Sequence, residues 1–200
     1  LDDGDDTVED LDVDADGYST CAGDCDDEDK DLSPADADLD GYSSCDGDCD
    51  DGDEDRNPGE LDIPDDGFVD EDCDGIDGDA SSAVFVSISG LDVGTCPKSS
   101  PCRTVDFAMD AADYVGFTEV YISAGTYNEI VNLRSGIDLY GGYNTSWDRA
   151  NRDQSGHTVT LIGDLHGSDD QYMTLRARSG ANALVADLKI QGPVVSGTSS

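Results

Sequence analysis

The sequence predicts a mostly β protein in two parts: an Asp-rich N-terminal part with little regular structure, then a part built from short strands. Three observations support this prediction. The formal net charge of −38 is concentrated before residue 80, a 24-residue period repeats within that acidic part, and short apolar segments broken by Gly, Asn, Asp or Ser follow it. We therefore expect one domain at 1–79 and a second at 83–200.

The acidic part has a composition that cannot fold by apolar burial alone. It holds 35 of the 48 acidic residues and two basic residues, Lys30 and Arg56. This charge excludes nucleic acid as a partner and favours cations or basic proteins. Its sparse apolar residues cannot offset ~1–2 kcal/mol of backbone entropy per residue. We expect an expanded coil unless a ligand neutralises the charge.

The repeat places its carboxylates at metal-loop spacing. "DVDADGYSTCAGDCDDEDKD" at 12–31 recurs as "DADLDGYSSCDGDCDDGDED" at 36–55. Calcium takes six to eight oxygens, and calcium loops supply them from positions 1, 3 and 5 and a carbonyl at 7, with Gly at 6. The predicted ligands are Asp12, Asp14, Asp16 and the carbonyl of Tyr18, then Asp36, Asp38, Asp40 and the carbonyl of Tyr42, and in a further copy Asp70, Asp72 and Asp74.

The end of each loop departs from the helix–loop–helix calcium site. That site has a bidentate Glu at position 12, where both repeats have Gly, and amphipathic helices flank it, which the repeats lack. We expect Asp24 and Asp48 to close the loops, with Asp27 and Asp51 as alternatives. A second acidic run in each period either binds a second ion or completes the first site: Asp27, Asp29 and Asp31, and Asp51, Asp53 and Asp55.

Three other interpretations of the repeat are weaker. A disordered acidic tail needs no Gly at a fixed place. Magnesium prefers octahedral, water-rich sites, whereas these loops are crowded with carboxylates and carbonyls. Zinc does not suit a C-x3-C spacing that recurs without a nearby His.

The cysteines indicate an oxidising, extracytoplasmic setting. Six of the seven form close pairs in the sequence, which predicts the disulfides Cys21–Cys25, Cys45–Cys49 and Cys96–Cys102. Cys73 is left over, either free or paired outside this chain. The chain has no apolar run that spans a bilayer, so we expect no membrane insertion. It starts inside a repeat-like tail, so we expect a processed chain or a fragment.

The acidic repeats resemble the metal-binding repeats of the MopE type, found in bacterial surface and secreted proteins. The pattern "DxDGY…C.GDCDD.D" carries the resemblance over about residues 1–79. The repeats are also similar to thrombospondin type 3 repeats, where Asp-rich coil wraps calcium in place of a hydrophobic core. The resemblance implies several calcium ions and a bacterial, extracellular or cell-surface protein. The closing segment is partly present, as "PGELDIPDDGFVDEDCDGIDGD", without the Cys expected after Glu60.

The second part alternates short strands with turns. Predicted strands lie in "VFVSISG", "TEVYISAG", "YNEIVNL", "GIDLYGGY", "TVTLIG", "YMTLRA" and "ALVADLKIQG". Apolar residues at helical spacing predict a helix near 104–114, which Thr104 or Ser100 would cap. Many short strands allow a sandwich, a barrel or a solenoid.

The order of these segments resembles the capped start of right-handed parallel β-helix proteins of the pectate-lyase-like class. The "VFVS" strand, the helix, "AGTYNE" and "LYGGY…W" carry the resemblance, well over 83–150 and loosely over 151–200. It implies that the helix plugs the open end of the solenoid and that further coils follow in the parent protein. Many β-helix proteins cleave or bind polysaccharide.

No residues with diagnostic catalytic spacing stand out, so we expect no catalytic residue. His157 and His166 are interpreted as surface or turn residues, and Trp147 as a rung or loop anchor. The bases and acids considered are Arg134, Arg149, Arg152, Arg176, Arg178, Lys189, Asp138, Asp148 and Asp164. We expect a calcium-rigidified structural or adhesion protein whose partners are polysaccharide, other surface proteins or its own copies. The alternatives are a polysaccharide-binding protein or lyase with a calcium module, and a passive calcium store.

Overall fold

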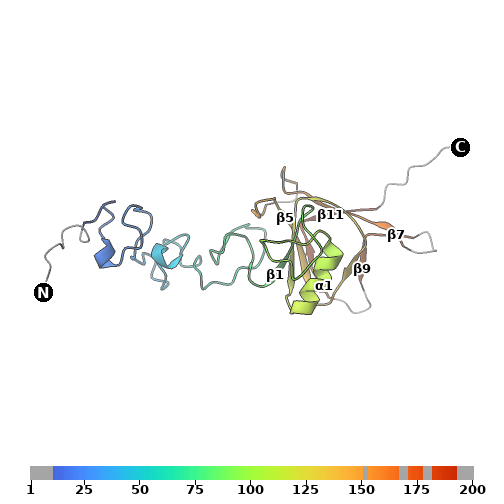
Figure 1. The fold of residues 1–200 in the computed structure, drawn as a ribbon, viewed down its shortest axis with the longest axis horizontal. Helices are drawn as coiled ribbons and strands as arrows, with labels where there is room; N and C mark the ends of the chain where they lie inside the picture. Colours follow the sequence, from blue (N-terminus) through green and yellow to red (C-terminus); the bar gives the residue numbers. More distant parts are fainter. Residues whose placement is uncertain (1–10, 151–152, 167–170, 178–181, 193–200) are drawn as a thin grey trace. The chain divides into compact units, whose positions relative to one another are not determined.

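The computed structural model describes residues 11–150, 153–166, 171–177 and 182–192 and divides the chain into two compact units (Figure 1). Unit 1 runs to Ile63 and resumes over Asp70–Gly78, and unit 2 contains Pro64–Val69 and the chain from Asp79 onward. The short segment 64–69 was expected to belong to the acidic repeats, but it packs with unit 2.

Unit 1 consists of loops around two short 3-10 helices, η1 (Thr20–Ala22) and η2 (Ser44–Asp46). The two helices are one 24-residue period apart, and each ends at a Gly in the left-handed conformation, Gly23 (φ 101°) and Gly47 (φ 97°). Residues 11–63 and 70–78 contain no α-helix or β-strand. The structure therefore agrees with the prediction that the acidic part has little regular secondary structure.

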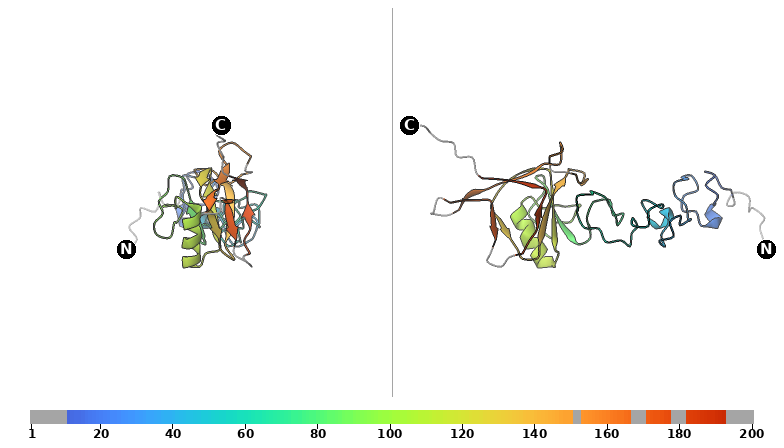
Figure 2. Two further views of the ribbon diagram at one scale, coloured as in Figure 1. Left: turned by 90° about the vertical axis from the view of Figure 1, so that its right-hand side faces the viewer. Right: turned by 180° about the vertical axis from the view of Figure 1, so that it is seen from behind.

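Unit 2 is built mainly from parallel strands (Figure 2). The first sheet has the order β1-β2-β5-β10 (Ala83–Val86, Glu119–Ser123, Asp138–Tyr143, Val185–Ala186). The second has the order β11-β6-β3 (Leu188–Gln191, Val159–Ile162, Gly125–Asn128). β4 (Val131–Leu133) pairs in parallel with β9 (Leu175–Ala177), and β7 (Asp164–His166) pairs in antiparallel with β8 (Gln171–Met173). The prediction of a mostly β protein is confirmed.

Consecutive strands of unit 2 pair with later strands in the same order. β2, β3 and β4 pair in parallel with β5, β6 and β9, and β10 and β11 then pair with β5 and β6. Val120 lies opposite Leu139, and Tyr127 lies opposite Leu161. All four residues are buried and belong to one apolar core. Each turn of the chain therefore buries its apolar side chains in the same interior as the turn before.

Helix α1 (Val105–Val115) covers part of this core and contacts β1, β2 and β4. It begins where predicted, because the Thr104 hydroxyl accepts a hydrogen bond from Phe107 N (3.4 Å). The Glu129 carboxylate accepts two more, from Val105 N (3.0 Å) and Asp106 N (2.8 Å). Gly116 ends the helix with φ 83°.

The sequence did not resolve every strand of unit 2. Three segments were each expected to form one strand, but each is shared by two: "YNEIVNL" by β3 and β4, "YMTLRA" by β8 and β9, and "ALVADLKIQG" by β10 and β11. β7 was not predicted at all. It covers Asp164–His166 and pairs in antiparallel with β8, and a three-residue strand carries too little periodicity to be recognised.

Candidate metal centres

The D-x-D-x-D-G loops of the two repeats have the same backbone conformation. Position 6 is Gly in the left-handed region, with φ 105° at Gly17 and 102° at Gly41. Position 4 is also left-handed although it is not Gly: φ is 67° at Ala15 and 74° at Leu39. Such residues cost roughly 1–3 kcal/mol each and persist where the surrounding structure requires them. The repeat therefore specifies one tightly turned loop.

The first Asp of each loop organises this turn. Asp12 accepts hydrogen bonds from Ala15 N at Oδ1 (2.6 Å) and from Gly17 N at Oδ2 (3.1 Å). Asp36 accepts the equivalent pair, from Leu39 N (2.7 Å) and Gly41 N (3.1 Å). The amides are those of the two left-handed positions, so this carboxylate holds the loop closed.

The next acidic residues of the first repeat each keep one oxygen for another partner. Oδ1 of Asp14, Asp16 and Asp24 accepts from the backbone amide two residues later, at 3.0, 2.8 and 3.0 Å. Oδ2 of the same three residues is buried and has no hydrogen-bond partner. Buried carboxylate oxygens without a partner are costly, so three in one loop form a donor set whose cost a bound cation would offset.

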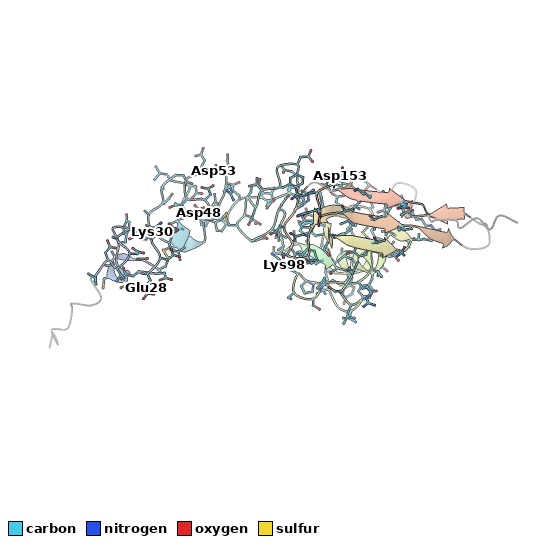
Figure 3. All side chains as sticks on the ribbon, turned by 90° about the horizontal axis from the view of Figure 1, so that it is seen from above. Glu28, Lys30, Asp48, Asp53, Lys98 and Asp153 are labelled. Carbon is cyan, nitrogen blue, oxygen red and sulfur yellow. A yellow bond between two sulfur atoms is a disulfide. The ribbon has the colours of Figure 1, made fainter. Side chains whose placement is uncertain are left out.

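The second repeat reproduces this arrangement in detail. Oδ1 of Asp38, Asp40 and Asp48 accepts from the amides two residues later, at 3.2, 2.7 and 2.8 Å, and Oδ2 of each is buried without a partner. Side chains of unit 1 are drawn in Figure 3, where Asp48 is labelled. Asp48 is buried, with 7 % of its surface exposed. The same free oxygens thus recur one period later.

Ligand atoms of these carboxylates converge. One oxygen from each of Asp12, Asp14 and Asp16 lies within 4.8 Å of the others, and the same holds for Asp36, Asp38 and Asp40. A further group joins Asp38 with Asp48 and Asp51. The structure therefore brings both proposed closing residues of the second repeat to one place. Oδ1 of Asp51 accepts from Ala37 N (3.0 Å), as Asp27 Oδ1 does from Val13 N (3.2 Å).

The electrostatics of the clusters match this geometry. Desolvation raises the pKa of Asp14, the hydrogen bond from the Asp16 amide lowers it, and the charges of Asp16, Asp24 and Asp12 raise it further. The pKa of Asp38 is raised for the equivalent reasons. Both groups are disfavoured as carboxylates in the metal-free loop. A bound divalent cation removes this penalty, so the donor set fits a hard cation with oxygen ligands.

The second acidic run of each repeat is more exposed to solvent than the D-x-D-x-D-G loop. Asp29, Asp31, Asp53 and Asp55 are all exposed. Asp29 Oδ1 accepts from Asp31 N (3.2 Å), and Asp53, at the outer edge of its loop in Figure 3, accepts from Asp55 N (3.4 Å). Their hydrogen bonds are local turns, and Asp31 pairs with Lys30 at 2.5 Å. This geometry favours one ion in each repeat.

A third cluster contains a residue that the sequence did not indicate. The ligand atoms of Asp62, Asp70 and Asp72 lie within 4.8 Å of one another. Asp62 is 2 % exposed, and desolvation raises its pKa to about 7. Desolvation, with the charge of Asp74 next, raises the pKa of Asp72 to about 6. Asp74 itself is exposed, and its amide donates to both Asp70 and Asp72.

The carbonyl ligands at position 7 stay a prediction. The amides of Tyr18 and Tyr42 donate to Asp16 and Asp40, which fixes the backbone at this position.

The predicted disulfides within the C-x3-C segments are wrong. Cys25 pairs with Cys45, and Cys49 pairs with Cys73, so each bridge joins one repeat to the next segment. Cys21 is free and exposed in η1. The left-handed turn at Gly23 separates it from Cys25, which is directed to the following repeat. The prediction of Cys96–Cys102 is confirmed. Three disulfides are typical of secreted proteins.

Residues considered for a glycan site are mostly engaged in unit 2. Trp147 is 9 % exposed and packs edge-on against Phe85 at 4.8 Å, so it is not a sugar platform. Arg134 pairs with Asp110, and Lys189 pairs with Asp153 at 2.9 Å. Arg176 is exposed. Arg152 and Arg178 lie outside the described residues, as do the side chains of Asp164 and His166.

His157 does not lie at the surface as predicted. It is 7 % exposed, and its Nδ1 lies 2.8 Å from the carbonyl oxygen of Gly142. This contact between a β5 residue and the loop before β6 makes His157 a buried structural residue.

Comparison of the chain with protein-family models, with curated proteins and with solved structures finds no match. In the part of the chain that the structure describes, no helix has both the length and the apolar character that crossing a membrane requires.

Proposed function

We propose that unit 1 is a calcium-binding repeat module that folds around its ions. The observation that carries this proposal is the set of buried carboxylate oxygens without a partner, one on each of Asp14, Asp16 and Asp24 and again one period later. Their repetition in register argues for a specific ligand rather than for diffuse charge. Calcium suits the site better than magnesium, because flexible loops rich in carboxylates and carbonyls match its larger coordination number.

Calcium binding would be part of the folding free energy of unit 1. Ions that bind the folded loops and not the coil stabilise the fold by mass action. Extracellular calcium modules bind at ~10⁻⁴–10⁻³ M, and the three disulfides accord with the extracellular or cell-surface location proposed here. Disulfides and ions would together replace an apolar core.

We also propose that unit 2 is the start of a parallel β-helix that serves as a rigid structural or adhesion platform. The support is the pairing of β2, β3 and β4 with β5, β6 and β9 in the same order, which is how successive coils of a solenoid stack. Helix α1 would cover the end of the solenoid. The partners proposed are polysaccharide, surface proteins or further copies of the chain.

Calorimetric calcium titration of matched variants tests the metal proposal. Asp48→Asn removes a carboxylate from the convergent set, and Asp53→Asn removes the same charge from an exposed position of the same repeat. We expect Asp48→Asn to weaken binding of one ion about tenfold or more, while Asp53→Asn binds like the unchanged protein. Equal binding by both variants, or no calcium binding by the unchanged chain, would contradict the proposal.

A further inference from the structure

In the third acidic cluster the buried Asp comes before the loop in the sequence, whereas in the two repeats it comes after the loop. In the repeats, the buried closing residue follows the first Asp of the loop by twelve residues, as Asp24 follows Asp12. The residue twelve positions after Asp70 is Ser82. Asp62, which precedes Asp70 by eight residues, instead places a ligand atom within 4.8 Å of those of Asp70 and Asp72.

The loop itself is otherwise built like the first two. Cys73 at position 4 and Gly75 at position 6 are left-handed, with φ 60° and 89°. Asp70 accepts from Asp74 N (3.1 Å) and Gly75 N (2.9 Å), so it also closes its turn, although one of the two donors is the amide at position 5 instead of position 4.

Asp62 supplies the free oxygen of this cluster. Its Oδ2 accepts from Glu71 N at 3.3 Å, and its Oδ1 is buried and has no hydrogen-bond partner. The residue is 98 % buried, and its ligand atom is among those that converge with Asp70 and Asp72 within 4.8 Å. A buried, unpartnered carboxylate oxygen beside two further carboxylates fits a divalent cation.

Asp62 and Asp70 lie on either side of the segment Pro64–Val69 in the sequence. This segment packs in unit 2, where Arg149 holds it: Nη1 donates to the Asp65 carbonyl oxygen (2.6 Å), and the guanidinium lies 5.1 Å from the Phe68 ring centroid. Phe68 has φ 56°, a conformation that needs such support in a residue other than Gly.

Arg149 is fixed independently of the segment. Its side chain is 1 % exposed, pairs with Asp187 at 2.6 Å, and donates from Nε to the Gly141 carbonyl oxygen at 3.2 Å. Unit 2 thus provides a rigid receptor for Asp65 and Phe68. Asp62 and Asp70 lie on either side of the segment, and their carboxylates repel each other. The contacts within unit 2 do not offset this repulsion.

We propose that Asp62, Asp70 and Asp72 bind a third calcium ion. This ion holds the two ends of Pro64–Val69 together and so stabilises the contacts of this segment with Arg149. This inference rests on the proposed calcium-binding function of unit 1. In this inference Asp62 is a ligand, and the third site differs from the repeat sites in its effect. Its ligands lie on both sides of a segment of unit 2 in the sequence, whereas those of each repeat do not.

The test compares Asp62→Asn with Asp66→Asn in the full chain. Asp66 is an exposed acid inside the bracketed segment, so both variants lose one charge. Calcium is titrated by calorimetry, and hydrogen exchange of residues 64–69 is followed with calcium and with chelator. We expect Asp62→Asn to bind one ion fewer and to lose the slowing of exchange by calcium, whereas Asp66→Asn keeps both.

The outcomes separate this inference from the function on which it rests. Absence of calcium binding by the unchanged chain would overturn both. Retention of every ion by Asp62→Asn would overturn the third site, and loss of one ion without an effect of calcium on 64–69 would overturn the clamp. Asp72→Asn is a second variant with the same expected result, and an intact Cys49–Cys73 bridge in peptide maps confirms that each variant has folded.

Discussion

The two units of the chain differ in what they bury. Among the described residues of unit 1, Ile76 is the one buried hydrophobic residue, and the other buried side chains are polar. They are Ser19, Asp24, Ser43, Asp48, Asn57, Asp62 and Asp77. Unit 2 instead buries an apolar cluster that runs from β1 through α1 to β11. Unit 1 is therefore organised around charge, and unit 2 around the hydrophobic effect.

The apolar residues of unit 1 confirm this contrast, because they remain in solvent. Leu39 is 83 % exposed between the half-buried Asp38 and Asp40, and Leu61 is 75 % exposed beside the buried Asp62. Burial of apolar area stabilises unit 2 without a ligand. Buried like charges destabilise unit 1 unless a cation is bound. We therefore expect the fold of unit 1 to depend on bound cations and the fold of unit 2 to form without them.

The largest effect of a substitution in unit 1 is expected at the bridge between repeats. Cys25→Ser combined with Cys45→Ser opens a loop with a sequence separation of 20 residues, which should lower the free energy of unfolding of the calcium-loaded unit 1 by about 3 kcal/mol. Denaturant unfolding followed by hydrogen exchange measures the loss unit by unit, and unit 2 should not change.

Cys21→Ser is the matched control for this prediction. Cys21 is a free, exposed residue of the same C-x3-C segment, so its substitution should leave both units as stable as before. If peptide mapping under non-reducing conditions linked Cys21 to Cys25, the bridge between repeats would be refuted.

A smaller effect is expected from pH, and its sign separates the units. Burial raises the pKa of Asp62 to about 7 and of Asp72 to about 6, and it also raises the pKa of Asp14 and Asp38. The metal-free fold thus binds more protons than the unfolded chain above pH ~4. In chelator, unit 1 should be most stable at about pH 4 and below, and should lose stability as the pH rises from about 4 through 7.

Urea titrations in chelator check this prediction: unit 1 should unfold with a measurable midpoint at pH 5 and should show little or no folded population at pH 8. With calcium present the trend should reverse, because protons compete with the ion for the same oxygens. A metal-free unit 1 that is equally stable or more stable at pH 8 would show that these acids are solvated in the fold.

Local features were the ones that the sequence predicted well. Thr104 caps α1, Gly17 and Gly41 turn the loops, and Asp24 and Asp48 bury an oxygen there, all because the determining contacts lie within about a dozen residues. The pairing of Cys49 with Cys73 and the place of Asp62 depend on contacts between segments. A spacing rule derived from the repeats could not find Asp62, because it lies on the opposite side of its loop in sequence.

Hydrogen exchange of the full chain with millimolar calcium and with excess chelator tests the central claim most directly. We predict that chelation at neutral pH brings the amides of residues 11–63 and 70–78 close to the exchange rates of an unfolded chain, because only the disulfides then constrain unit 1. The amides of β2, β5 and β6 should keep their protection. Equal protection of both units with and without calcium would contradict the account, since unit 1 would then be stable without the cation that its buried carboxylates require.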